Sequence, residues 1–152
     1  MAGGAVGDHG VMSIVTCVSC ATRNRVPAAA SGRPRCATCR ADLPWLVEGT
    51  DADFDAVVAT KVPVVVDLWA PWCGPCKTLG PILERVVGET GGEVVLAKVN
   101  TDENPGLSDL FQVQGIPAVY AVKDRKVVSQ FVGAQPESVV RQFVDSLRPT
   151  EE

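Results

Sequence analysis

The cysteines are the residues of this 152-residue chain whose types and spacing point most directly to chemistry. All six fall into Cys-x2-Cys pairs, which are Cys17 and Cys20, Cys36 and Cys39, and Cys73 and Cys76. In a reducing compartment such pairs bind metal ions or catalyse redox reactions rather than building a disulfide scaffold. The chain therefore has two candidate chemistries, a metal site and a catalytic dithiol.

The first two pairs are separated by fifteen residues, which is the spacing of a four-cysteine zinc ribbon. A two-residue gap lets a tight turn direct two thiolates at one tetrahedral ion about 2.3 Å away. Residues 12–43 contain no aromatic side chain, so zinc would supply folding free energy that this segment lacks. Four thiolates leave no open coordination position, so we predict a closed structural zinc site. Two surface disulfides or four unrelated buried thiols are the alternative.

The third pair lies in the segment Trp72-Cys-Gly-Pro-Cys-Lys77, which follows an apolar run and opens a predicted helix. Free backbone N–H groups and the positive end of the helix dipole favour a thiolate at Cys73. We therefore predict Cys73 as the accessible nucleophile that attacks a substrate disulfide. Cys76 lies one turn further into the helix, where we expect it to be a shielded thiol that resolves the mixed disulfide.

These sulfurs must be positioned by the elements that follow residue 44, where every aromatic residue of the chain lies. Apolar periodicity and turn signals predict strands over 45–47, 62–69, 94–99, 118–122 and 127–132, and helices over 51–59, 73 to 88 or 91, 105–111 and 137–147. This order predicts an α/β fold with a mixed central sheet flanked by helices. We expect a disordered tail over 1–11, a zinc ribbon over 12–43 and a second domain, containing the core, over 44–152.

Composition and charge exclude several classes of protein. With 46% hydrophobic and 21% charged residues the chain is globular rather than disordered or fibrous. It has no run of about 18 apolar residues, and no basic residue precedes Arg23 as a secretory signal would require, so we expect a cytoplasmic protein without a membrane span. Arginines dominate the predicted ribbon, but the net charge of −4 and the lack of ribbon aromatics argue against nucleic acid as a partner.

Residues 67–77, Asp-Leu-Trp-Ala-Pro-Trp-Cys-Gly-Pro-Cys-Lys, resemble the active-site stretch of thioredoxins. Together with the ribbon, the chain resembles zinc-containing thioredoxins of the thioredoxin-two type over about residues 12–148. Further matches in register are Pro81, Lys98, Asn104-Pro105, Gly115-Ile116-Pro117 and Gly133-Ala134. The resemblance implies a thioredoxin fold and a protein-disulfide reductase. Such an enzyme acts on oxidised client proteins and is regenerated by an NADPH-dependent thioredoxin reductase.

The resemblance also implies roles for particular residues. Asp67 would be a buried carboxylate that takes and returns the proton of Cys76, with Lys98 nearby, and Pro117 would follow a cis peptide bond. An apolar substrate groove would be lined by Trp72, Gly74, Pro75, Ile116, Pro117 and Gly133. Two positions depart from the family pattern: Ala118 replaces a common threonine, and Arg125 occupies a hairpin position where glycine would ease a positive φ. At Arg125 we therefore expect a different type of turn.

Two other functions fit the same cysteines. In the first, the protein is a zinc-thiolate oxidation sensor or a partner-binding module, and zinc release by mild peroxide with negligible insulin reduction would indicate it. In the second, it is a thiol oxidase or isomerase, which a reduction potential far above the reducing range would indicate. The Gly-Pro interior of the third pair resembles the reducing members of the fold.

Overall fold

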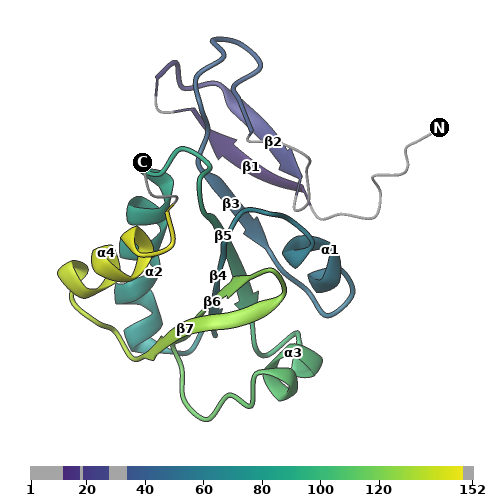
Figure 1. Cartoon of the computed structure of the whole chain (residues 1–152), viewed down its shortest axis with the longest axis vertical. Coiled ribbons are helices and arrows are strands. Elements are labelled where there is room, and N and C mark those ends of the chain that lie inside the picture. Colours follow the sequence, from purple (N-terminus) through teal and green to yellow (C-terminus); the bar gives the residue numbers. More distant parts are fainter. Residues whose placement is uncertain (1–11, 18, 28–33, 149–152) are drawn as a thin grey trace.

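The computed structural model describes residues 12–17, 19–27 and 34–148, so the predicted tail lies outside the described residues. Two strands, β1 (Met12–Thr16) and β2 (Arg23–Pro27), form an antiparallel hairpin at one end of the molecule (Figure 1). The rest alternates strands and helices, in the order β3 (Trp45–Glu48), α1 (Phe54–Val58), β4 (Val64–Trp69), α2 (Gly74–Gly88), β5 (Val95–Asn100), α3 (Pro105–Leu110), β6 (Ala118–Lys123), β7 (Lys126–Val132) and α4 (Glu137–Asp145). The predicted element order from residue 45 onward is confirmed.

The five later strands form one mixed sheet in the order β3-β5-β4-β6-β7. Strand β5 pairs in parallel with both β3 and β4, whereas β6 is antiparallel to β4 and to β7. Strand β4 is therefore the central strand, and five of its six residues are buried. A strand covered on both faces reads as a continuous apolar run, which is why the segment Val64–Trp69 carries a single charged residue, Asp67.

Helices cover the sheet on both faces (Figure 1). Because side chains alternate along a strand, Val64, Val66 and Leu68 face the cluster that contains α1 and α3 residues, and Val65 faces the cluster built by α2 and α4. By the same alternation Asp67 shares the face of Val65. The sheet thus directs the one carboxylate of β4 toward helix α2.

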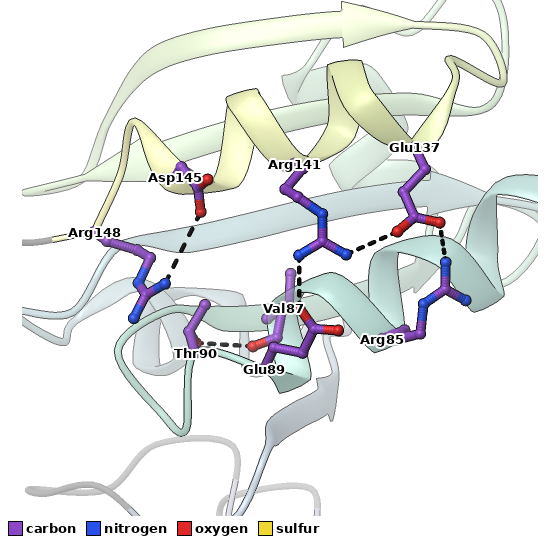
Figure 2. A network of polar contacts seen from close by, with 8 residues as sticks. All are labelled: Arg85, Val87, Glu89, Thr90, Glu137, Arg141, Asp145 and Arg148. Carbon is purple, nitrogen blue, oxygen red and sulfur yellow. Dashed lines mark hydrogen bonds and ion pairs between the residues drawn. The ribbon is translucent and has the colours of Figure 1, made fainter.

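Helices α2 and α4 are joined by a network of charged side chains along one edge (Figure 2). Glu137 forms ion pairs with Arg85 and with Arg141, and Arg141 also reaches Glu89 at 2.6 Å. The side chains of these pairs are half exposed, so solvent screens their attraction and each pair contributes little to stability. The apolar contacts beneath them, including Phe143 with the partners of its cluster, supply most of the packing between the helices.

The ribbon region is packed against the sheet rather than separate from it. Val15 and Val26, on the inner face of the β1–β2 hairpin, belong to the same buried cluster as Leu43 and Trp45. Trp45 is only 1% exposed. The expectation that the core lies wholly after residue 44 is therefore wrong, because alternate residues of the hairpin join the buried cluster of the sheet and extend the core into the ribbon.

Two local expectations also need correction. Asp124 and Arg125, between β6 and β7, both have positive φ, 54° and 64°. A two-residue hairpin loop with both central residues at positive φ matches the twist of the strands, so the turn keeps this geometry without glycine. The first helix begins at Phe54, three residues later than predicted, and its N-cap residue Asp53 accepts the N–H of Thr50 at 2.8 Å. None of the helices in the described part of the chain has the length and apolar character needed to cross a bilayer.

Candidate functional site

The third cysteine pair lies at the start of helix α2, as predicted, and is joined in a disulfide. Cys73 is the N-cap residue, and its Sγ accepts the backbone N–H of Cys76 at 3.2 Å. Pro75 occupies the first turn, where the absent N–H would have no partner in any case. This cap and the positive end of a 15-residue helix stabilise a negative charge on Cys73 when the disulfide is opened.

The exposure of the two cysteines differs from the expectation. In the disulfide form Cys73 is 4% exposed and Cys76 is 7% exposed, so Cys73 is not the more accessible of the two residues. Both cysteines cluster with Ala70, and the side chains of Trp69 and Ile116 pack against them. The adjacent Trp72, in contrast, is 69% exposed, and its Nε1 donates to Asp102 Oδ1 at 3.1 Å.

Asp67 lies beneath the start of α2 and is 2% exposed. Its Oδ1 is buried without a hydrogen-bond partner in the described part of the chain. Burial is the main cause that raises the pKa of Asp67 to about 6. The positive charge of Lys98 lowers this pKa, and the negative charge of Glu84 raises it further. A carboxyl with this pKa exchanges its proton near neutral pH, which is the property a general base requires.

A cavity of about 270 Å³ connects this carboxyl to the dithiol and to solvent. Its lining includes Asp67, Cys76, Gly80, Glu84 and Lys98. Lys98 lies beside Asp67, as its register partner on the adjacent strand β5. The family resemblance implied that Lys98 would be near Asp67. Its Nζ, however, pairs with Glu84 Oε2 at 2.7 Å and lies 5.4 Å from the centre of the Trp69 ring.

The predicted groove residues are brought together only in part. Trp72 and Ile116 line one shallow hollow beside the dithiol, together with Thr101, Val113, Gln114 and others that the sequence analysis did not identify. The Ile116–Pro117 peptide bond is cis, and the N–H of Gly133 donates to the Pro117 carbonyl at 2.8 Å. Gly74 and Pro75 are exposed on the first turn of α2 and do not line this hollow.

The other four cysteines converge at the ribbon, with all four Sγ atoms within 4.8 Å of one another. Cys17 Sγ lies 3.7 Å from Cys39 Sγ, and Cys20 Sγ lies 3.6 Å from Cys36 Sγ. In a tetrahedral zinc site with Zn–S bonds of about 2.3 Å, the sulfurs are about 3.8 Å apart. The four thiols are thus spaced as one tetrahedral ion requires, and they could hold a metal ion.

Two equivalent turns carry these cysteines. In each turn the first cysteine donates its N–H to a carbonyl five residues on, at 2.8 Å, and its carbonyl accepts an N–H from four residues on, at 2.9 Å. The residue after the second cysteine of each pair, Ala21 or Arg40, has a positive φ of 66° or 69°. The sequence signals the sulfur spacing but not this conformation, because neither position is glycine.

The pKa values of Cys36 and Cys39 are shifted in opposite directions. Backbone N–H groups, first that of Cys39, lower the pKa of Cys36 to about 5. The N–H of Ala41 lowers the pKa of Cys39, but Cys20, burial and the other two sulfurs outweigh it and raise this pKa to about 11. Four adjacent thiolates therefore need a cation among them, which fits a metal site of this donor set.

Comparison with known proteins agrees with this geometry. Residues 45–146 match the family model for thioredoxin. Thioredoxin 2 of Chlorobaculum tepidum is 40% identical over 99 residues, which cover 64% of this chain and 91% of that protein. Mitochondrial thioredoxin of Bos taurus is 47% identical over 96 residues, or 62% of this chain and 58% of that protein.

A solved structure supports the same assignment. The crystal structure of Malassezia sympodialis thioredoxin aligns with a TM-score of 0.64 and 27% identity, covering 70% of this chain and 93% of that one. The matched family segment contains the dithiol, the buried carboxylate and the cis-proline loop, and it begins just after the ribbon. The chain therefore belongs to the thioredoxin family of thiol–disulfide oxidoreductases, with four clustered cysteines ahead of its thioredoxin domain.

Proposed function

We propose that the protein is a protein-disulfide reductase that acts through Cys73 and Cys76, and that Asp67 serves as its proton acceptor. The observation that carries this proposal is the dithiol at the start of α2 with a buried carboxyl on the same cavity. A helix N-terminus favours the thiolate needed for attack, and a carboxyl with a raised pKa can take a proton near neutral pH.

The reaction starts from the reduced dithiol. The Cys73 thiolate attacks one sulfur of a client disulfide, forming a Cys73–client bond and releasing the other client sulfur as a thiolate, which takes a proton from water. Cys76 then attacks Cys73 Sγ while its proton passes to the Asp67 carboxylate. The Cys73–Cys76 disulfide forms, the second client thiolate leaves, and the client has gained two electrons. Asp67 returns its proton to solvent through the cavity.

The remaining residues fit supporting roles in this proposal. Lys98 contributes a positive charge to the cavity of Asp67. An extended client segment would lie on the hollow lined by Trp72 and Ile116 and on the exposed Gly74 and Pro75. The predicted groove residues Pro117 and Gly133 would support it from the adjacent cis-proline loop, where the Gly133 N–H donates to the Pro117 carbonyl. The partners are oxidised client proteins, and a thioredoxin reductase that uses NADPH restores the dithiol. The reaction needs a reducing compartment, for which we propose the cytoplasm.

For the ribbon we propose a structural zinc ion held by Cys17, Cys20, Cys36 and Cys39. Four cysteine ligands fill a tetrahedral site, so the ion would stabilise the fold without binding substrate. We retain residues 12–43 as the zinc ribbon and 44–152 as the thioredoxin domain. Val15 and Val26 share one buried cluster with Trp45 across this boundary.

Insulin reduction tests the proposed function. Wild-type protein supplied with NADPH and a thioredoxin reductase should reduce insulin disulfides catalytically, consuming one NADPH for each disulfide. The control is protein alkylated with iodoacetamide after reduction, which should be inactive. If the native protein is also inactive while its dithiol is reduced by dithiothreitol, the chain is not a general protein-disulfide reductase.

Asp67→Asn is expected to stabilise the protein at neutral pH and to slow it as a catalyst. The folded-state pKa of about 6 lies about two units above the unfolded value, so folding retains a proton between about pH 4 and pH 6. The free energy of unfolding therefore falls as pH rises through that window, by about 3 kcal/mol in total. Asparagine does not ionise, so the variant should not lose this stability as the pH rises. Reduction of insulin should slow by about 10²-fold, because the proton acceptor is missing.

Urea unfolding of the oxidised protein at pH 4 and pH 7.5, together with insulin reduction, measures both effects. Asp109→Asn, on the exposed surface of α3, is the matched control and should change neither quantity. An Asp67→Asn protein with the same pH dependence of stability as wild type would show that Asp67 is not the titrating group.

A further inference from the structure

Glu84 is the acidic residue that helix α2 contributes to the cavity beside the dithiol. It follows Cys76 and Gly80 at four-residue intervals, so the three lie along one face of α2 above the sheet. All three line the cavity that contains Asp67 and Lys98. Glu84 therefore reaches the site from the helix that carries the dithiol.

The carboxylate of Glu84 forms an ion pair with Lys98, the residue beside Asp67 in the sheet. Lys98 and Asp67 are neighbours in register on β5 and β4, yet the ammonium of Lys98 lies 2.7 Å from Glu84 Oε2 and over the ring of Trp69. A Cβ atom on Gly80 would lie 3.6 Å from Lys98 Nζ, so the small residue at position 80 leaves room for the ammonium beneath the helix. Within the described part of the chain, Asp67 Oδ1 has no hydrogen-bond partner.

We propose that Glu84 is a positioning residue for the dithiol reaction, which holds the Lys98 ammonium off Asp67 and so keeps that carboxyl able to carry the Cys76 proton. This inference rests on the proposed function, because it assumes that Asp67 receives that proton. Without Glu84, Lys98 is free to turn toward Asp67 and pair with it. A carboxylate paired in this way holds a proton less readily and is a weaker base.

Few charged groups face Asp67 in the described part of the chain, so a shift in its titration can be traced to a single substitution. Strand β5 contributes Lys98, helix α2 contributes Cys76, Lys77 and Glu84 to the shared cavity, and strand β6 places the apolar Val119 opposite Asp67. In the oxidised protein the disulfide removes both cysteines from the titration. The carboxyl curve of Asp67 then reports its interaction with Lys98 and Glu84.

The test is the titration of Asp67 in oxidised Glu84→Gln, followed by carboxyl ¹³C NMR of aspartate-labelled protein. We expect the midpoint for Asp67 to fall by about half a pH unit or more relative to wild type, because a negative charge is lost and Lys98 is released. The control is Glu89→Gln, which removes the same charge at the far end of α2 and breaks the pair with Arg141. It should leave the Asp67 midpoint unchanged.

The pH profile of insulin reduction supplies a second readout, in which the acidic limb of the rate should shift with the Asp67 midpoint. An unchanged midpoint in Glu84→Gln, or an equal shift in Glu89→Gln, would overturn the inference. Failure of the wild-type protein to reduce insulin would instead overturn the proposed function, since the NMR titration does not depend on activity.

Discussion

Cys73→Ser protein is expected to lose insulin reduction by about 10³-fold or more, whereas Cys76→Ser protein should stop at a covalent complex with its client. A serine hydroxyl is not ionised at neutral pH, so it cannot replace the thiolate that attacks the client disulfide. Serine at position 76 leaves the first attack intact but removes the sulfur that resolves it. The two substitutions, three residues apart, should thus give opposite chemical results.

The geometry at the start of α2 makes Cys73 the attacking residue and Cys76 the resolving residue. Cys73 is the N-cap, and its Sγ already accepts the N–H of Cys76, whereas Cys76 lines the cavity that leads to Asp67. A thiolate is stabilised at the first position and a proton acceptor is available at the second.

Mass spectrometry of each variant incubated with an oxidised client distinguishes the roles. The Cys76→Ser variant should gain the mass of the client, and dithiothreitol should release it. The Cys73→Ser variant should gain none, and both should keep the circular dichroism of wild type. An adduct on Cys73→Ser and none on Cys76→Ser would reverse the assignment.

The catalytic pair was predictable from sequence because its function depends on local structure. A Cys-x2-Cys segment between an apolar run and a helix already determines which sulfur caps the helix. The central strand was predictable for a similar reason, since a run such as Val64–Trp69 suits burial on both faces. The roles of Asp67 and Lys98 were predicted from the family resemblance alone, because neither segment indicates that β4 and β5 are adjacent strands in this register.

What could not be predicted depends on packing between distant elements. The ion pair of Glu84 with Lys98 joins α2 to β5, and the hydrogen bond of Trp72 with Asp102 joins the dithiol loop to the loop after β5. The one available signal for the former was the four-residue interval that separates Cys76 from Gly80 and Gly80 from Glu84, which places all three on one face of the helix. Packing of the ribbon against the sheet was not predicted, because residues 12–43 contain few large apolar side chains. The two that join the buried cluster, Val15 and Val26, lie on one face of a hairpin.

Removal of the proposed zinc ion is expected to unfold the ribbon while leaving the dithiol active. The ribbon contributes Val15 and Val26 to the core, but the four cysteines form its centre, and structural zinc sites of small domains contribute about 10 kcal/mol or more of apparent binding free energy. The cluster between the sheet and helices α2 and α4 contains no ribbon residue among those described. That cluster should hold the dithiol and Asp67 in place after the ribbon has opened.

Cys36→Ser provides the sharpest version of this experiment. Cys36 is fully buried, and its Sγ lies between the Thr38 N–H at 3.4 Å and Cys20 Sγ at 3.6 Å, so serine there removes a ligand from the middle of the cluster. The purified variant should lose its equivalent of zinc and the hydrogen-exchange protection of β1 and β2. Its α2 and β4 amides should stay protected, and insulin reduction should stay within about threefold of wild type.

Ser19→Ala, in the exposed turn between the first two ligands, is the matched control, and it should retain both zinc and protection. Wild-type protein purified without metal, and unaffected in its exchange pattern by a strong chelator, would show that packing on Trp45 alone holds the ribbon. Loss of protection throughout β4 and α2 in Cys36→Ser would show instead that the ribbon and the catalytic domain unfold as one unit. The distinction follows from the division of the buried clusters. The described residues of the ribbon belong to the cluster on one face of the sheet, and Asp67 lies on the other face.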